Sequence, residues 1–175
     1  MNLNAVTGLF RSGRFNSGLL NSGLFIAGLA FAGTAVADIA PTDVVWTDEV
    51  NVTRQLTVAP GDAPGGVGVV SSRSQGNCVA CHQFSSLPEV QFQGNVGPSL
   101  DGVGSRWSEA ELRGILIDAK QMFPDTRMPS FYRDSGYIRP GDRYTGRAAD
   151  PETFGPLLSA QQIEDTIAYL MTLTD

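Results

Sequence analysis

The chain has 175 residues, with 12 basic and 18 acidic side chains, two cysteines and one histidine. Its net charge of −6 at pH 7 argues against nucleic acid or an anionic membrane as partner, and favours a protein or redox carrier of complementary positive charge. Three cysteine and histidine side chains are also too few for an ordinary four-ligand structural zinc site.

Residues 1–37 have the three parts of a secretory signal peptide: two arginines, an apolar stretch, and the small-x-small cleavage site Ala35-Val36-Ala37. The apolar stretch is shorter than a bilayer span and is broken by glycines, so an uncleaved anchor is the weaker interpretation, and no later segment is suited to span a membrane. We predict Sec export to the periplasm, with cleavage after Ala37. The remaining length, about 140 residues, suits one domain with a single core.

Residues 38–58 show no clean alternation and are predicted to form an irregular, partly extended N-terminal arm, lying on the domain or on a partner. The domain itself is predicted to cover residues 59–175. Residues 62–73 form either a short helix or a loop that becomes helical only near Val67, because Gly65, Gly66 and Gly68 lower the helix propensity. If the segment is a helix, a close packing contact with another element would explain why it contains these glycines.

Residues 78–82 read Cys-Val-Ala-Cys-His and contain both cysteines and the only histidine. This C-x-x-C-H run is the attachment signature of c-type haem, in which two thiols form thioethers and the imidazole reaches the iron. A thioredoxin-like motif would need a βαβ context, and a structural disulfide would leave the histidine without a role. We therefore expect Cys78 and Cys81 to attach one haem c covalently and His82 to be its proximal ligand.

Gly97-Pro98-Ser99-Leu100 follows the motif. Such a turn either presents a backbone carbonyl to Nδ1 of His82, a contact that orients ligating histidines, or is a simple turn before the next helix. Five aromatic residues nearby are candidates to line a haem crevice, although aromatic residues more often only fill a core. They are Phe84, Phe92, Phe123, Phe131 and Tyr132.

Two helices are predicted from capping boxes, at Ser108 with Glu111 and at Ser159 with Gln162. The first is expected to bury Leu112, Ile115 and Leu116. The terminal helix carries an apolar stripe of Ile163, Ile167 and Leu170 at helical spacing. With no clear strand outside the arm, the predicted fold class is all-α.

Because the chain has no second histidine, methionine is the expected sixth iron ligand. Met128 precedes Pro129 in a non-helical stretch, where a rigid loop is able to aim its thioether inward. Met122 and Met171 remain alternatives, although both are explained by core packing. Ligation by His82 and Met128 raises the reduction potential and blocks both axial positions, which favours electron transfer over oxygen chemistry.

The segment 127–147 is rich in arginine within an acidic protein. It forms either a docking or propionate-pairing patch or a nearly neutral solvated loop, and the interleaved Asp125, Asp134 and Asp142 favour the neutral loop. The arginines are Arg127, Arg133, Arg139, Arg143 and Arg147.

The C-x-x-C-H run, Gly97-Pro98-Ser-Leu100, the Met128-Pro129 pair and the terminal helix resemble class I cytochrome c. The resemblance implies that the first and last helices cross at a glycine-aromatic contact, here Tyr169 with one of Gly65, Gly66 or Gly68.

A closer resemblance, to the SoxX family of monohaem subunits of sulfur-oxidising SoxAX cytochromes, covers most of the mature chain. It is carried by residues 76–82, Gly102-Val-Gly-Ser-Arg106, Met128-Pro-Ser-Phe-Tyr-Arg133 and Leu158-Ser-Ala-Gln-Gln-Ile-Glu-Asp-Thr-Ile-Ala-Tyr-Leu170. The resemblance implies a heterodimer with a SoxA-like haem subunit that holds the catalytic haem. That pair joins thiosulfate oxidatively to a cysteine of a SoxYZ-like carrier, as an L-cysteine S-thiosulfotransferase.

Within that family the small subunit takes up the electrons and passes them to a downstream cytochrome c or another acceptor. The residues agree with this role, because haem attachment consumes both cysteines and leaves no thiol for sulfur chemistry. Two other functions remain open: a free-standing periplasmic monohaem shuttle serving an oxidase or another dehydrogenase, and an open-site haem that binds ligands.

Overall fold

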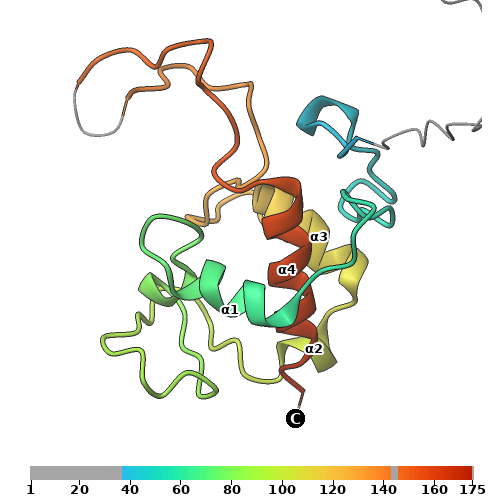
Figure 1. Ribbon diagram of the computed structural model, residues 1–175, viewed down its shortest axis with the longest axis vertical. Coiled ribbons are helices and arrows are strands. Elements are labelled where there is room, and N and C mark those ends of the chain that lie inside the picture. The colour runs from blue at the N-terminus through green and yellow to red at the C-terminus, as the bar shows by residue number, and fades with distance from the viewer. Residues whose placement is uncertain (1–36, 143–145, 175) are drawn as a thin grey trace, which may run out of the picture. The chain divides into compact units, whose positions relative to one another are not determined.

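The computed structural model describes residues 37–142 and 146–174 (Figure 1). It contains α1 (Ala63–Ser71), α2 (Val103–Arg106), α3 (Glu109–Asp118) and α4 (Ala160–Met171), with 3-10 turns η1 (Pro41–Asp43), η2 (Cys78–Ala80) and η3 (Ala119–Gln121). The described residues form isolated bridges and no strand, which confirms the all-α prediction. None of the helices in these ranges is long and apolar enough to cross a membrane.

Helices α1 and α4 make the main helix-helix contact of the domain, and Figure 1 shows them crossing. The Asp62 side chain caps α1 by accepting from the Gly65 N–H, so the helical interpretation of residues 62–73 is correct. A Cβ built on Gly66 would lie 2.7 Å from Cβ of Tyr169 and 2.8 Å from the carbonyl carbon of Asp165. Gly66 therefore makes the predicted glycine-aromatic contact.

Both predicted capping boxes are formed, by Ser108 with Glu111 and by Ser159 with Gln162. The apolar stripe of α4 is buried as predicted. In α3 the prediction was partly wrong, because Ile115 is only half-buried while Ile117 is 2 % exposed. The last turn of α3 is buried, and Ile117 points into the core there, next to the buried Leu116 and Asp118.

The N-terminal arm lies on the domain. Val52 and Leu56 are each 1 % exposed and belong to the same core as the helices. The N–H of Val52 donates to the Ala110 carbonyl at 3.0 Å, and the hydroxyl of Tyr132 donates to the Ile39 carbonyl at 2.6 Å. Of the predicted signal peptide, only Ala37 belongs to the described residues.

A buried ion pair between Arg113 of α3 and Glu164 of α4 joins the arm to both helices. Nε and Nη2 of Arg113 donate to the two carboxylate oxygens of Glu164 at 2.8 and 2.9 Å. Nη1 of Arg113 donates to the Val52 carbonyl at 2.9 Å, and the N–H of Leu56 donates to Glu164 at 2.9 Å. Each side chain of the pair is 2 % exposed, so three segments distant in sequence are fixed by one buried cluster.

Candidate haem site

The C-x-x-C-H motif folds as a tight turn around η2. Asn77 precedes it in the left-handed conformation, with φ 48°, and the N–H groups of Cys81 and His82 both donate to the Cys78 carbonyl. This geometry places two thiols and an imidazole on one turn of backbone. Cys81 is exposed, Cys78 and His82 are partly buried, and both cysteines are free thiols.

The surroundings of Cys78 favour its protonated thiol. Burial, to which the neighbouring Cys81 adds, raises the pKa of Cys78 to about 12, so the side chain is a protonated thiol at neutral pH. Among the described residues, no group of three or more histidine, cysteine or acidic side chains is arranged to hold a metal ion.

The His82 ring is oriented by the backbone of the next loop. Its Nδ1 lies 2.7 Å from the Pro98 carbonyl oxygen, so of the two interpretations of the Gly97-Pro98 turn the one with a carbonyl contact to the imidazole is correct. A carbonyl oxygen only accepts, so Nδ1 carries the proton and Nε2 keeps its lone pair. Ligating histidines are usually oriented in this way, with one nitrogen held and the other available to a metal.

The backbone of residues 94–98 packs directly against the C-x-x-C-H motif. The N–H of Gly94 donates to the Val79 carbonyl and that of Gly97 to the Cys81 carbonyl, both at 2.8 Å. A Cβ on Gly97 would come within 2.6 Å of Nδ1 and 2.8 Å of Nε2 of His82. Only glycine at position 97 leaves room for the imidazole, which explains this residue by close approach.

The loop that carries Pro98 is fastened by Arg106 and Asp101, which the sequence did not single out as site residues. Arg106 donates to the Ser99 carbonyl at 3.1 Å and to the Asp101 carbonyl at 2.5 Å. The Asp101 carboxylate accepts from the N–H and the hydroxyl of Ser85, each at 2.8 Å, and these hydrogen bonds hold the pKa of Asp101 below its usual value. These contacts hold the segment that follows His82, including the loop that carries Pro98, in a fixed position.

The predicted aromatic residues differ in placement. Phe84, Phe131 and Tyr132 belong to the buried core, and Phe84 stacks on Tyr169 with ring centroids 6.1 Å apart. In contrast, Phe92 is 93 % exposed and Phe123 is 42 % exposed.

Met128 lies in a loop that returns along α3. Its side chain is half-buried against the core, its N–H donates to the Thr126 hydroxyl at 3.2 Å, and its carbonyl accepts from the Lys120 ammonium at 2.9 Å. Met171 also packs against the core, from α4, and Met122 follows η3 and is half-buried. Met128 lies inside this hydrogen-bonded loop, whereas Met122 stands at its start, with its N–H donating to the Ala119 carbonyl, and Met171 ends α4.

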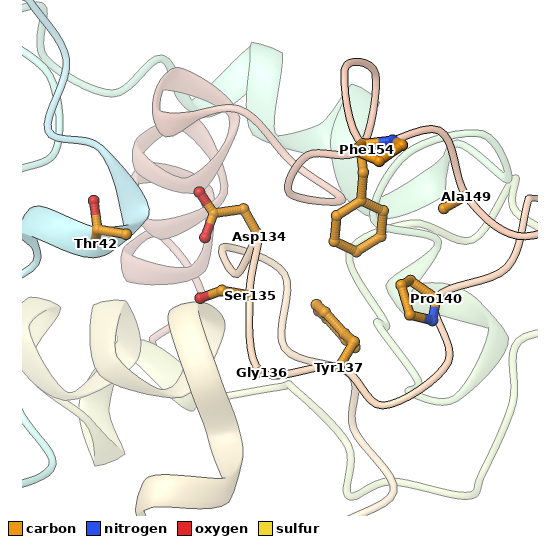
Figure 2. Close-up of a pocket in the computed structure, with 9 residues that line it drawn as sticks. Thr42, Asp134, Ser135, Gly136, Tyr137, Pro140, Ala149 and Phe154 are labelled. Carbon is orange, nitrogen blue, oxygen red and sulfur yellow. The ribbon is translucent and has the colours of Figure 1, made fainter.

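The arginine-rich segment contains a pocket of about 510 Å³ whose lining includes none of the predicted site residues. Figure 2 shows the side chains of Tyr137 and Phe154 next to each other in its lining. Their rings meet edge to face, with ring centroids 5.4 Å apart. Arg133 lies over the Tyr137 ring and pairs with Asp118 at 3.2 Å, so this arginine has a structural role within the fold. Arg143 lies outside the described residues.

The residues of the turn fit a covalently attached haem. Two free thiols are separated by the spacing that the vinyl groups require, and the imidazole beside them is oriented with Nε2 available.

The comparisons with known proteins agree with this geometry. A family model for cytochrome c matches residues 72–174. The chain is similar to a chain in the crystal structure of SoxXA from P. pantotrophus, with 48 % identity and a TM-score of 0.75, over 79 % of this chain and 100 % of that chain. No curated protein sequence matches the chain. The chain belongs to the cytochrome c family and is a SoxX-type monohaem cytochrome with one covalently bound haem c.

Proposed function

We propose that this chain is the electron-accepting subunit of a SoxAX-type complex that couples thiosulfate to a carrier cysteine. The observation that carries the proposal is the 48 % identity to a chain of the SoxXA structure, over the full length of that chain. The residue content supports it as well, since both cysteines stand in the attachment motif and none is left to accept sulfur. Chemistry on sulfur is therefore assigned to a SoxA-like haem subunit, acting on a SoxYZ-like carrier.

Coupling thiosulfate to a cysteine thiol forms one sulfur-sulfur bond and releases one proton and two electrons. A c-type haem supplies a one-electron carrier when bound. In this chain Cys78 and Cys81 would hold it covalently, while the imidazole of His82 and the thioether of Met128 would occupy the two axial positions. Proton transfer needs no group in this chain, because the proton leaves from the carrier thiol, and each electron passes on to a downstream cytochrome c or other acceptor.

The same proposal assigns the parts of the chain. Residues 1–37 are a signal peptide removed after Ala37, residues 38–58 are the arm, and residues 59–175 are the haem domain of a periplasmic protein. The mass and N-terminal sequence of protein purified from the native host test this division, with Asp38 as the expected first residue.

Co-purification from the native host tests the function. We expect a stable heterodimer with a second haem protein, and reduction of this chain's haem when thiosulfate and a SoxYZ-like carrier are added to the complex. A lone monomer whose haem is not reduced under these conditions would reject the proposal and support a free electron shuttle.

The ligand assignment is tested by Met128→Ala in the holoprotein, with Met171→Ala as a matched control. Loss of the thioether opens an axial position, so we expect the reduced Met128→Ala protein to bind carbon monoxide at neutral pH and the control to bind none. The ferric Met128→Ala protein should also lose the charge-transfer absorption typical of thioether ligation. An unchanged spectrum would move the assignment to Met122 or Met171.

A further inference from the structure

We propose that Asp118 is a positioning residue for Met128, whose buried carboxylate fastens the Met128 loop, residues 122–133, to the end of α3. The inference rests on the proposed role of Met128 as an iron ligand. It deepens that role by identifying what holds Met128 in place, because a methionine side chain has three rotatable bonds and is positioned for ligation only if its backbone is fixed.

Asp118 is the last residue of α3 and is 4 % exposed. Its Oδ1 accepts from the Ser130 hydroxyl at 2.5 Å and from the N–H of Lys120 at 3.3 Å. Its Oδ2 accepts from the Gln121 amide and from Nη1 of Arg133, both at 3.2 Å. Lys120 and Gln121 precede the loop, and Ser130 and Arg133 follow Met128 within it. One carboxylate therefore connects the chain on both sides of Met128.

Neighbouring contacts extend this attachment. The N–H groups of Phe131 and Tyr132 donate to the carbonyls of Leu116 and Ile117, at 3.1 and 3.3 Å. The Lys120 ammonium reaches the Met128 carbonyl from the other side. The returning chain therefore lies along the last turn of α3, and Ser130, two residues after Met128, connects that chain to Asp118.

The arrangement requires an ionised carboxylate, because all four partners donate. Burial acts to raise the pKa of Asp118, but the hydrogen bonds from Ser130, Gln121 and Lys120, with the charge of Arg133, outweigh it and lower the pKa. An asparagine would accept at one position and present its own N–H groups at the other, where it faces donors. Asp118→Asn therefore keeps the size of the side chain and removes about half of the attachment.

Asp118→Asn in the holoprotein tests the proposal, with Asp125→Asn as the matched control. Asp125 is an exposed carboxylate of the same loop and makes no hydrogen bond or ion pair with residues 37–142 or 146–174. For Asp118→Asn we expect the equilibrium for loss of thioether ligation to shift about 10–100-fold, the range seen when groups that orient metal ligands are removed. The shift is measured by weaker thioether absorption in the ferric protein and by carbon monoxide binding in the reduced one.

Ser130→Ala provides a second variant in case Asp118→Asn does not fold, since it removes only one of the four donors. It should shift the same equilibrium in the same direction, by less. If Asp118→Asn, or Ser130→Ala where the first variant is unfolded, retains ligation equal to that of Asp125→Asn, the proposal is overturned. Met128→Ala separates this failure from that of the ligand assignment: if Met128→Ala keeps the thioether absorption, the assignment and this inference both fall.

Discussion

The buried ion pair of Arg113 and Glu164 predicts a large loss of stability from a substitution far from the haem motif. Glu164→Gln keeps the shape of the side chain but removes the charge that compensates Arg113. Besides the side chain at position 164, the guanidinium has the carbonyls of Val52 and Glu109 as partners, and the only other carboxylate near it among the described residues is that of Glu109, 3.8 Å away and 57 % exposed. An uncompensated charge at a site that is 2 % exposed costs about 3–5 kcal/mol.

For a domain of this size that cost corresponds to a fall in melting temperature of roughly 10–15 °C. Denaturant unfolding of the holoprotein, followed by far-ultraviolet circular dichroism, measures the free energy directly. Glu109→Gln is the matched control, since it removes an exposed carboxylate from the same arginine, and it should cost about 0.5 kcal/mol or less.

A double variant sharpens the test of the ion pair. Arg113→Met should cost an amount similar to Glu164→Gln, because it leaves the Glu164 carboxylate without its cation. Combining the two changes should cost clearly less than the sum of the single losses, since the charge left unpaired by one change is removed by the other. Equal costs for Glu164→Gln and Glu109→Gln, or strict additivity in the double variant, would refute the reasoning.

Two further predictions concern packing and pH. Gly66→Ala should destabilise the protein by about 1–3 kcal/mol, because its Cβ would press against α4, whereas Gly68→Ala, with nothing within 4 Å, should stabilise it by about 1 kcal/mol; equal denaturation midpoints would contradict this. The pKa of folded Asp118 lies below its ordinary 3.8, so its stabilisation is present above that pH and is lost as the pH falls through the lower folded value. Urea midpoints measured against pH should fall less steeply in Asp118→Asn.

Short-range patterns in the sequence predicted α3 and α4. They left a helix at α1 and a carbonyl contact to His82 each as one of two alternatives, and α2 was not predicted. Each capping box needs only a residue and its neighbour three positions on, and the Gly97-Pro98 turn follows the motif closely in sequence. The contact of Gly66 with Tyr169 was predicted from the family resemblance, and only the structure identifies which of the three glycines makes it. Such contacts are predictable from sequence because each residue's partner is fixed by the local backbone or by a known fold.

The buried polar groups were not predicted, because their partners are distant in sequence. Arg113 lies four residues after Glu109 and has the pattern of an exposed helix pair, yet its main partner is 51 residues away. Asp118 stands at the C-terminal end of a helix, where a negative charge is unfavourable for the helix dipole. The hydrogen bonds that Ser130 and Arg133 of the returning loop donate to its carboxylate offset this unfavourable interaction.

The same distinction explains why one predicted iron ligand followed directly from the sequence and the other did not. His82 is the sole histidine, and the carbonyl that orients it comes from the Gly97-Pro98 turn, which the sequence indicates. Met128 was one of three internal methionines. It lies inside the loop that Asp118 and Lys120 attach to α3, whereas Met122 stands at the start of that loop and Met171 lies at the end of α4. The position of Met128 is therefore set by tertiary contacts, and under the proposed ligation substitutions in those contacts should weaken the binding of iron by Met128 while leaving the C-x-x-C-H turn intact.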